Sequence, residues 1–211
     1  MARFDTERKE MIEILKERGI SDEAVLSAML KVERHLFVDA TFLNRAYDDS
    51  ALPIGSDQTI SQPYTVAFMT QALNPKKGSK ILEVGTGSGY QAAVLATIGC
   101  RVFTIERHLD LLFAARKLFD MLKLRIVAKG GDGTIGWSEY APFDGIIVTA
   151  GAPSMPQSLV NQLADGGRIV IPIGSRENQK IVIGTKQKDI LHTSVYDGFK
   201  FVPLIGKSGW N

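Results

Sequence analysis

A glycine-rich turn at residues 82–90 carries the residues best suited to binding a ligand. It reads Leu-Glu-Val-Gly-Thr-Gly-Ser-Gly-Tyr and follows a short apolar run at 80–82. An apolar strand that enters a glycine turn and continues as a helix is typical of nucleotide-type binding loops. At Gly85 and Gly87 no Cβ stands in the way, so the backbone can approach a ligand closely. The alternative is that these glycines only make a tight turn.

The spacing of the glycines indicates which ligand the turn accepts. A dinucleotide-binding turn needs glycine or alanine five positions after the first glycine, so that the helix packs close beneath a pyrophosphate. Here that position is Tyr90. Its bulk argues against a pyrophosphate and favours a ligand without phosphates, such as S-adenosylmethionine.

Acidic residues stand at three places where such a ligand would offer hydrogen-bond donors. Glu106 ends the next predicted strand, 21 residues after Gly85, where a carboxylate can accept bonds from both ribose hydroxyls. Gly131-Asp132-Gly133 follows the third strand, and its carboxylate can reach the adenine amine. Glu83 can bind the methionine amino group directly or through water. The alternatives are a surface carboxylate for Glu106 and an ordinary Asp-Gly turn at 131–133.

The elements that must position these residues alternate between strand and helix from residue 79 onward. Near-continuous apolar strands separated by helices predict a parallel sheet covered on both faces, with right-handed connections. The fold class predicted is α/β, a Rossmann-like class I methyltransferase fold with a mostly parallel, doubly wound sheet. The predicted strands are 80–84, 101–106, 125–128, 145–149 and 168–172, and the predicted helices are 91–98, 110–122 and 156–164.

The two ends of the chain differ from this core. Two amphipathic helices open it, the second beginning after Ser21 with Asp22 and Glu23 in its first turn, and another helix begins at Pro63. The segment 32–62 between them is of mixed character. Near the C-terminus, 180–186 and 190–196 are too close together for a crossover helix, which predicts an antiparallel pair at the sheet edge. We expect one domain, 1–211, made of a helical substrate-side extension (1–78) and the Rossmann-like core (79–211).

Composition excludes several classes of protein. The 211 residues are 45% apolar, and 25 Lys and Arg against 23 Asp and Glu leave a formal charge of +2. This balance does not favour nucleic acid or membrane as partners.

The segment Met1–Asp5 lacks a signal-peptide apolar region, and no stretch approaches the ~18 apolar residues of a membrane span, so a cytoplasmic protein is expected. Cys100, the sole cysteine, is expected to be a packed core thiol, and no metal site is predicted.

The methyl acceptor is not named by this fold. Methylation of adenine or cytosine in DNA usually pairs the fold with an Asn/Asp-Pro-Pro-Tyr/Phe motif after the fourth strand. Here residues 143–153 read Phe-Asp-Gly-Ile-Ile-Val-Thr-Ala-Gly-Ala-Pro, without a carboxamide or a proline pair. Nucleobase chemistry is therefore disfavoured, while a small-molecule acceptor remains open.

The segment 52–64, Leu-Pro-Ile-Gly-Ser-Asp-Gln-Thr-Ile-Ser-Gln-Pro-Tyr, resembles the signature of the protein-L-isoaspartate (D-aspartate) O-methyltransferases. The similarity covers almost the whole chain. Further matches to the family lie at 83–90, 131–133, 150–153 with Pro156, Gln157 and Leu159, 166–168 and 202–204. The Gln-Thr-Ile-Ser-x-Pro string is specific to this family, whereas many methyltransferases share the glycine turn.

The resemblance implies a carboxyl methyltransferase that moves a methyl group from S-adenosylmethionine to the free carboxylate of isoaspartyl residues in damaged proteins. A carboxylate, whose ordinary pKa is about 4, is already ionised at pH 7 and needs no general base. Ser61 matches the active-site serine of the family and is assigned as a hydrogen-bond donor that orients this carboxylate. No Gly-x-Ser-x-Gly elbow surrounds it, so it is not a nucleophile. The alternative is that Ser61 caps the helix beginning near Pro63, where unpaired N–H groups are expected to favour an anion.

The resemblance also implies which residues bind the cofactor. The sequence departs from the family at two positions. Asp57 stands where the family usually has glycine and puts substrate affinity in doubt, and Ile205 stands where some relatives have threonine. The expected partners are isoaspartyl-containing peptides and proteins, and the expected state is a monomer. A methyltransferase for another acceptor and a non-catalytic cofactor-binding protein are the alternatives. The implied cofactor-binding residues are Thr59, Ile60, Glu83, Gly85, Thr86, Gly87, Ser88, Glu106, Arg107, Gly131, Asp132 and Gly133.

Overall fold

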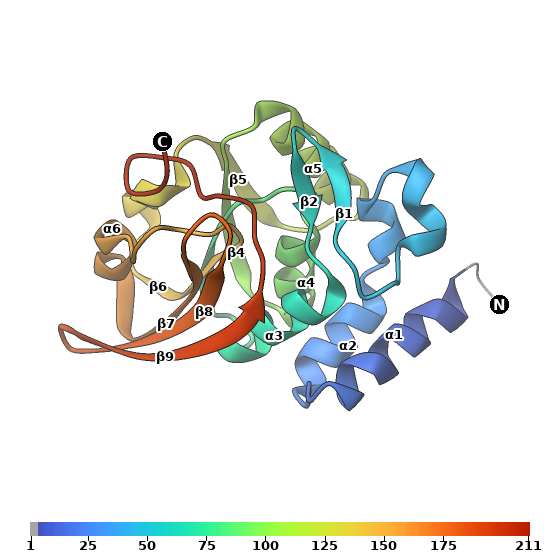
Figure 1. The fold of residues 1–211 in the computed structure, drawn as a ribbon, viewed down its shortest axis with the longest axis horizontal. Helices are drawn as coiled ribbons and strands as arrows, with labels where there is room; N and C mark the ends of the chain where they lie inside the picture. Colours follow the sequence, from blue (N-terminus) through green and yellow to red (C-terminus); the bar gives the residue numbers. More distant parts are fainter. Residues whose placement is uncertain (1–3) are drawn as a thin grey trace.

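A seven-stranded sheet forms the centre of the protein, in the order β5-β4-β3-β6-β7-β8-β9. The computed structural model describes residues 4–211 (Figure 1), so part of the N-terminal segment considered above, residues 1–3, lies outside the described residues. The five strands β3 to β7 run parallel, and β8 and β9 add to the edge as an antiparallel pair. The strands are β3 (Lys80–Val84), β4 (Arg101–Glu106), β5 (Ile126–Gly130), β6 (Phe143–Val148), β7 (Leu163–Gly174), β8 (Gln179–Gln187) and β9 (Ile190–Phe199).

Strand β3 lies at the point where the direction of strand order reverses. It pairs with β4 on one side and with β6 on the other. Leu82 and Val84 pack into the core on one face of the sheet, and Ile81 packs into the core on the opposite face. Burial on both faces explains why β3 is apolar at the neighbouring positions Ile81 and Leu82 as well as at Val84. The loops after β3 and β6 therefore diverge and leave a crevice at the carboxyl ends of the strands.

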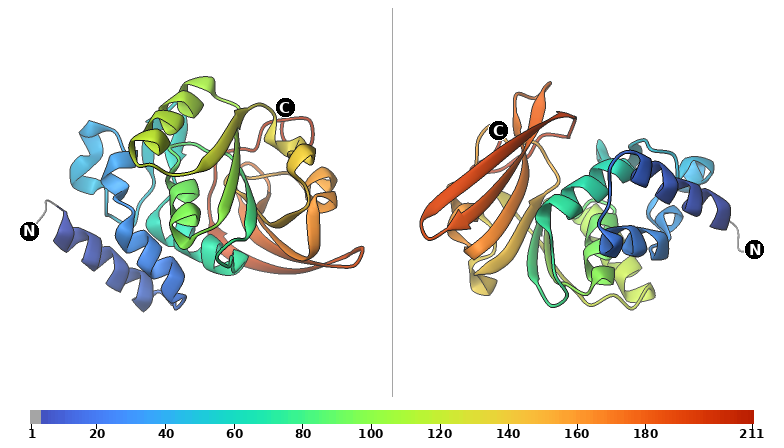
Figure 2. Two further views of the ribbon diagram at one scale, coloured as in Figure 1. Left: turned by 180° about the vertical axis from the view of Figure 1, so that it is seen from behind. Right: turned by 90° about the horizontal axis from the view of Figure 1, so that it is seen from below.

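Helices cover the two faces unequally (Figure 2). On one face lie α3 (Pro63–Leu73), α4 (Tyr90–Ile98) and α5 (Leu109–Met121), which share a core with the strands. On the other lie the short helix α6 (Gln157–Asn161) and the aromatic side chains of Trp137 and Tyr140. The predicted Rossmann-like class I methyltransferase fold is confirmed.

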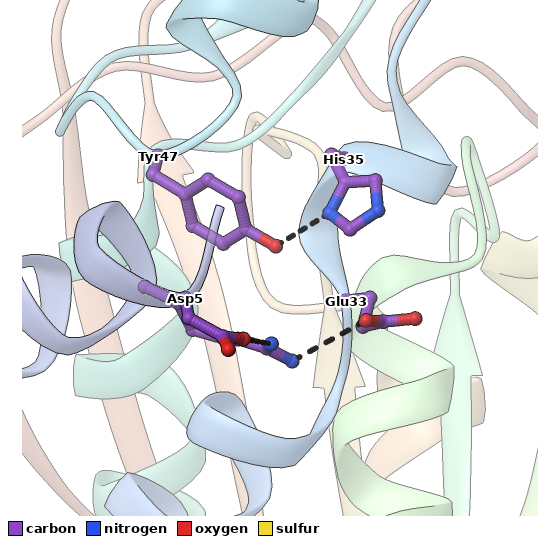
Figure 3. A network of polar contacts seen from close by, with 5 residues as sticks. Asp5, Glu33, His35 and Tyr47 are labelled. Carbon is purple, nitrogen blue, oxygen red and sulfur yellow. Dashed lines mark hydrogen bonds and ion pairs between the residues drawn. The ribbon is translucent and has the colours of Figure 1, made fainter. Parts of the chain in front are cut away.

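The N-terminal helices form an additional layer outside α3 and α4. Helices α1 (Asp5–Glu17) and α2 (Glu23–Lys31) share a buried apolar cluster with them. Figure 3 shows part of the polar network in this layer. In it the hydroxyl oxygen of Tyr47 lies 2.7 Å from His35 Nδ1. In the same network Arg8 bridges two carboxylates, Asp5 at 2.7 Å and Glu33 at 3.6 Å. Arg8 thus links the first turn of α1 to Glu33, just after α2.

The segment 32–62 contains structure that its sequence pattern did not predict. Two 3-10 helices, Arg34–Phe37 and Ala40–Arg45, precede a hairpin of β1 (Leu52–Gly55) and β2 (Gln58–Ile60). Ser56 and Asp57 form its tip with φ of 49° and 55°, and positive φ at both central residues matches the twist of a two-residue hairpin. The strands are too short for an alternating pattern to stand out, and burial of Leu52 opposite Ile60 sets their register.

Several predicted boundaries were wrong by a few residues. The helix predicted over 156–164 ends at Asn161, because the chain from Leu163 pairs with Phe143 as the start of β7. Strand β5 extends to Gly130, which pairs with Glu106. Helix α2 is capped by Asp22, whose side chain accepts hydrogen bonds from the N–H groups of Ala24 and Val25. Strand pairing decided where α6 and β5 end, and side-chain capping decided where α2 begins.

Two expectations drawn from composition can be compared with the structure. Cys100 is a buried thiol in the core beside α3 and α4, as predicted, and burial raises its pKa to about 11. Within residues 4–211 no helix combines the length and apolar character needed to cross a membrane.

Candidate active site

A cavity opens at the carboxyl ends of β3, β4, β5 and β6, where strand order reverses. Its wall is built by the residues that follow each strand, by β2 and α3, and by the chain beyond β9. We call it the cofactor cavity. The predicted site residues that line it are Thr59, Ile60, Ser61, Gly85, Thr86, Gly87, Ser88, Glu106, Arg107, Gly131 and Gly133.

Two glycines of the turn after β3, Gly85 and Gly89, have no room for a side chain. Gly85 has a φ of 96°, and a Cβ there would lie 2.3 Å from Thr149 Oγ1. The Thr149 hydroxyl donates instead to the Gly85 carbonyl at 2.7 Å, which ties the ends of β3 and β6 together. Gly89 has a φ of 87° and begins α4 against Phe119, which a Cβ would approach to 2.6 Å. These contacts make glycine necessary at both positions.

Glu106 holds the cavity wall together through three backbone N–H groups. One carboxylate oxygen accepts from Gly87 N at 2.8 Å, and the other accepts from Arg107 N and His108 N at 2.9 Å each. The residue is 5% exposed and lines the cavity. A carboxylate has about four acceptor positions, so with three of them occupied about one remains for a hydroxyl donor of a ligand. This arrangement suits the predicted role with a ribose.

Glu83 lies outside the cavity wall, behind the glycine turn. It is fully buried, and Thr104 Oγ1 donates to one of its oxygens at 2.5 Å. Thr104 also contacts Thr86 Oγ1 at 2.6 Å, so Glu83 is connected to the turn through two threonines. Burial raises the pKa of Glu83 to about 8, against the opposing hydrogen bond from Thr104. Contact between this carboxyl group and the methionine part of a cofactor stays a prediction.

The raised pKa of Glu83 predicts a pH-dependent stability. The folded protein binds a proton here that the unfolded chain releases near pH 4.5, so stability should fall as pH rises from about 4.5 to about 8. The slope from this residue is at most about 1.4 kcal/mol per pH unit. Glu83→Gln removes the titration, and we expect a higher Tm than wild type at pH 8 and a similar Tm at pH 5. Thermal unfolding across this pH range measures the difference in Tm, with the exposed Glu7→Gln as control. Parallel curves of Tm against pH for Glu83→Gln and wild type would contradict the prediction.

Asp132 also lies outside the cavity wall, although both flanking glycines line it. One oxygen accepts from Thr134 N at 2.8 Å and from Thr134 Oγ1 at 2.7 Å, and the other accepts from Lys207 N at 2.8 Å. The Asp-Gly turn considered as the alternative is therefore present. The carboxylate serves protein donors, and the predicted contact with the adenine amine stays untested.

Ser61 lies between β2 and α3 and does not cap the helix. The N-cap residue of α3 is Gln62, and Asp49 accepts a hydrogen bond from Tyr64 N at 2.8 Å. Asp49 thus takes the place that the capping alternative gave to Ser61, and the expectation of unpaired N–H groups at this helix end is wrong for Tyr64. Ser61 lines the cofactor cavity instead.

A second cavity adjoins the first, and we call it the acceptor cavity. The two share Thr59, Ser61, Thr65, Thr149 and Val202. Ser61 therefore lies on the wall common to both cavities. Among the described residues that line the acceptor cavity, Lys200 is the one with a charge, and Phe199 and Phe201 supply aromatic surface.

The two departures from the family fall in different places. Asp57 is exposed at the hairpin tip and lines neither cavity. Its φ of 55° is one that aspartate tolerates better than most residues. Ile205 lines the cofactor cavity with an apolar side chain.

Sequence reasoning missed part of the cavity wall. Thr149 entered as the last residue of the predicted strand 145–149 and within the stretch that lacks a nucleobase motif, without a role in the site. Gln91 reads as an ordinary helical residue. Val202, Pro203 and Leu204 entered only as a family match. Thr149 could have been predicted, because it stands at the end of the fourth core strand and the ends of parallel strands meet at one edge of the sheet. Nothing local marks the others.

Comparison with known proteins agrees with this geometry. The protein-L-isoaspartate (D-aspartate) O-methyltransferase family matches residues 6–209 of the chain. A protein-L-isoaspartate O-methyltransferase of Chlorobium phaeobacteroides is 54% identical over 204 residues, covering 96% of this chain and 94% of the relative. One from Geobacter metallireducens is 52% identical over 211 residues, covering 98% and 97%.

A solved structure extends the comparison to three dimensions. It is described as a putative protein-L-isoaspartate O-methyltransferase from Plasmodium falciparum in complex with S-adenosyl-L-homocysteine. It superposes with a TM-score of 0.81 at 27% identity, covering 94% of this chain and 98% of that one. By sequence and by fold, the chain belongs to the protein-L-isoaspartate (D-aspartate) O-methyltransferase family.

Proposed function

We propose that this protein transfers a methyl group from S-adenosylmethionine to the free α-carboxylate of L-isoaspartyl residues in damaged proteins. The observation that carries the proposal is the meeting of two cavities at Ser61. One lies at the strand-order reversal and is lined by Glu106, and the other is lined by Lys200, an exposed residue. The names of the relatives and the S-adenosyl-L-homocysteine in the Plasmodium falciparum structure support the same assignment.

The residues present fit an adenosine cofactor. The glycine turn places Gly85 and Gly87 on the cavity wall, and Glu106 lines the same cavity with about one acceptor position left for a ribose hydroxyl. When bound, the cofactor supplies an electrophilic methyl group on a sulfonium. Gly85, Gly87 and Glu106 hold it in this proposal, and the apolar wall made by Leu204 and Ile205 keeps water away.

The acceptor side needs orientation and no proton transfer. An ionised carboxylate is already a nucleophile at pH 7, so the Ser61 hydroxyl donates one hydrogen bond that aims an acceptor oxygen at the shared wall. Positioning alone can supply roughly 7–11 kcal/mol of a barrier in favourable cases. The new bond joins this oxygen to the methyl carbon as the carbon–sulfur bond breaks, giving a methyl ester and S-adenosylhomocysteine.

A pair of matched peptides tests the proposed function. Labelled methyl groups should enter a peptide containing one isoaspartyl residue and should not enter the same peptide with normal aspartate. Equal incorporation into both, or none into either, would reject the proposal. Labelling of RNA, DNA or metabolites with the isoaspartyl peptide inert would instead favour another acceptor.

Lys200 should contribute to the affinity for the acceptor. Lys200→Gln removes the charge from the acceptor cavity, and we expect KM for an isoaspartyl peptide to rise roughly two- to fivefold, as for an exposed ion pair. The effect should weaken with added salt, and KM for S-adenosylmethionine should not change. Asp57→Asn, which removes a charge outside both cavities, is the matched control. A change confined to the cofactor KM would contradict this role.

A further inference from the structure

Strand β9 contains an extra residue just before it reaches the acceptor cavity. Ile181 of β8 pairs with Tyr196 of β9. The next pair, Gln179 with Phe199, lies two residues along β8 but three residues along β9. The extra residue makes a β-bulge that contains Gly198. Gly198 has a φ of 91°, which glycine adopts without the steric penalty of a Cβ.

The bulge decides which face of the sheet Phe199 occupies. Side chains alternate between faces along a strand, so Tyr196 and Phe199 would lie on opposite faces of a regular strand. Both rings instead contact Phe68 of α3, with ring centroids 5.3 Å apart for Tyr196 and 4.9 Å apart for Phe199. Phe199 also stacks on Tyr64, in the first turn of α3, at 6.1 Å, and Figure 1 shows β9 ending beside this helix. The bulge therefore turns the end of β9 toward the acceptor cavity, which Phe199 and Lys200 line.

Gln179 holds the chain beyond the bulge in place. Its side chain is 3% exposed. Its Oε1 accepts from Phe201 N at 3.0 Å, and its Nε2 donates at 2.5 Å to Ser175 O, in the turn between β7 and β8. That turn contributes Asn178 to the acceptor cavity, and the chain around Phe201 contributes residues 198–202. One buried amide group therefore joins two segments of the acceptor cavity wall.

The adjoining wall of the cofactor cavity has an attachment of its own. Gly151 N donates to Val202 O at 2.8 Å, and Gly151 O accepts from Leu204 N at 2.8 Å. These bonds hold residues 202–204, which line the cofactor cavity, and they do not involve the side chain of Gln179. Loss of the Gln179 amide should therefore loosen the acceptor wall and leave the cofactor wall in place.

We propose that Gln179 is a positioning residue for the methyl acceptor, acting through the segment that follows the β9 bulge. The proposal rests on the proposed function. The amide of Gln179 fixes Phe201, and the bulge together with the stack on Tyr64 fixes Phe199. Lys200 lies between these two fixed residues and is thereby held at the acceptor cavity. Gln179 itself lines neither cavity, so its effect on the acceptor is indirect.

Gln179→Met tests this role with little change of shape. Methionine is also unbranched, and it keeps the packing of Cγ against Gly151, where a Cβ would lie 3.0 Å from Gln179 Cγ. The substitution leaves the buried N–H of Phe201 without its acceptor. At saturating S-adenosylmethionine, we expect KM for an isoaspartyl peptide to rise roughly three- to tenfold. Hydrogen exchange of residues 199–202 should become faster, while KM for S-adenosylmethionine and the Kd for S-adenosylhomocysteine should not change.

Gln162 offers a matched control, because it also joins a backbone N–H to a carbonyl. Its Oε1 accepts from Trp137 N at 2.7 Å, and its Nε2 donates to Ile135 O at 2.9 Å. It lines neither cavity. Gln162→Met should lower Tm and leave both KM for the isoaspartyl peptide and exchange of residues 199–202 unchanged. An equal rise of this KM in both variants would show that Gln179 acts only through overall stability, and would overturn the proposal.

Two substitutions at Gly198 test the bulge itself, whether or not Gln179→Met folds. A Cβ there would meet nothing within 4 Å beyond its chain neighbours, so the strain comes from the positive φ, which asparagine tolerates better than alanine. KM for the isoaspartyl peptide should therefore rise more in Gly198→Ala than in Gly198→Asn. A larger rise with the bulkier asparagine would mean that the side chain only blocks the cavity, and the proposal would be wrong.

The wild-type chain separates failure of this proposal from failure of the proposed function. A wild-type chain that leaves isoaspartyl peptides unmethylated would remove the proposed function and this role of Gln179 together. If the wild-type chain methylates them, an unchanged peptide KM in Gln179→Met despite faster exchange of residues 199–202 would overturn this proposal alone. A loss carried by KM for S-adenosylmethionine would do the same.

Discussion

Ser61→Ala should lower kcat toward an isoaspartyl peptide by roughly 10- to 100-fold. The serine lies on the wall shared by the cofactor and acceptor cavities, and in the proposed function its hydroxyl donates to the acceptor carboxylate. A hydrogen bond to a charged group contributes about 1.5–3 kcal/mol, and each ~1.4 kcal/mol is tenfold in rate. Stability should change by less than about 0.5 kcal/mol, because Ser61 is not fully buried and does not cap α3.

Steady-state kinetics with both substrates, combined with calorimetric binding of S-adenosylhomocysteine, check this expectation. The cofactor affinity of Ser61→Ala should stay close to that of wild type, since its neighbours Thr59 and Ile60 keep the wall in place. Ser27→Ala, on the exposed side of α2, is the control for a serine-to-alanine change without effect. An unchanged kcat, or a loss carried entirely by cofactor binding, would rule out the orienting role.

Glu106→Gln should weaken cofactor binding by roughly 10- to 100-fold. The carboxylate of Glu106 accepts from Gly87, Arg107 and His108. A carboxamide has only one acceptor oxygen and turns its NH₂ group toward at least one of these N–H groups. A buried N–H left unpaired costs about 1–3 kcal/mol, and the ribose hydroxyls lose a charged acceptor at the same time.

The same substitution should also lower Tm, because the three N–H groups belong to the fold as well as to the site. A destabilisation of about 1 kcal/mol lowers Tm by roughly 2–4 °C in a domain of this size. Calorimetry with S-adenosylhomocysteine and thermal unfolding measure the two effects, with Glu7→Gln on the exposed face of α1 as control. Cofactor affinity within about twofold of wild type would show that Glu106 is only structural.

The core of the fold follows from local pattern. Strands β3 and β4 have the predicted bounds, and helices α4 and α5 begin and end within one residue of theirs. Long apolar runs and helical periodicity are strong local signals, so these elements could be predicted. The β1–β2 hairpin could not, because four and three residues carry too little pattern. The start of β7 depends on pairing with β6, which is a contact distant in sequence.

The site residues also fall into those that local motifs predict and those that only distant contacts place. The sequence by itself determined the glycine turn, the acidic residue at the end of the second strand of the core and the serine before α3, because each lies in a short motif whose chemistry is local. It also determined the family, through the string around Ser61. The three-dimensional arrangement brought eleven of the thirteen predicted site residues to one cavity.

Tertiary structure alone decided what Glu83, Asp132 and Lys200 face. Glu83 turns toward Thr104 on the neighbouring strand, and Asp132 meets a backbone N–H 75 residues away. Lys200 joins the acceptor cavity because it follows directly on β9, whose last residue, Phe199, lines the same cavity. A motif fixes the type of group and its place along the chain. The partner of that group is fixed by which distant segments pack against it, and packing is settled by the burial of the whole fold.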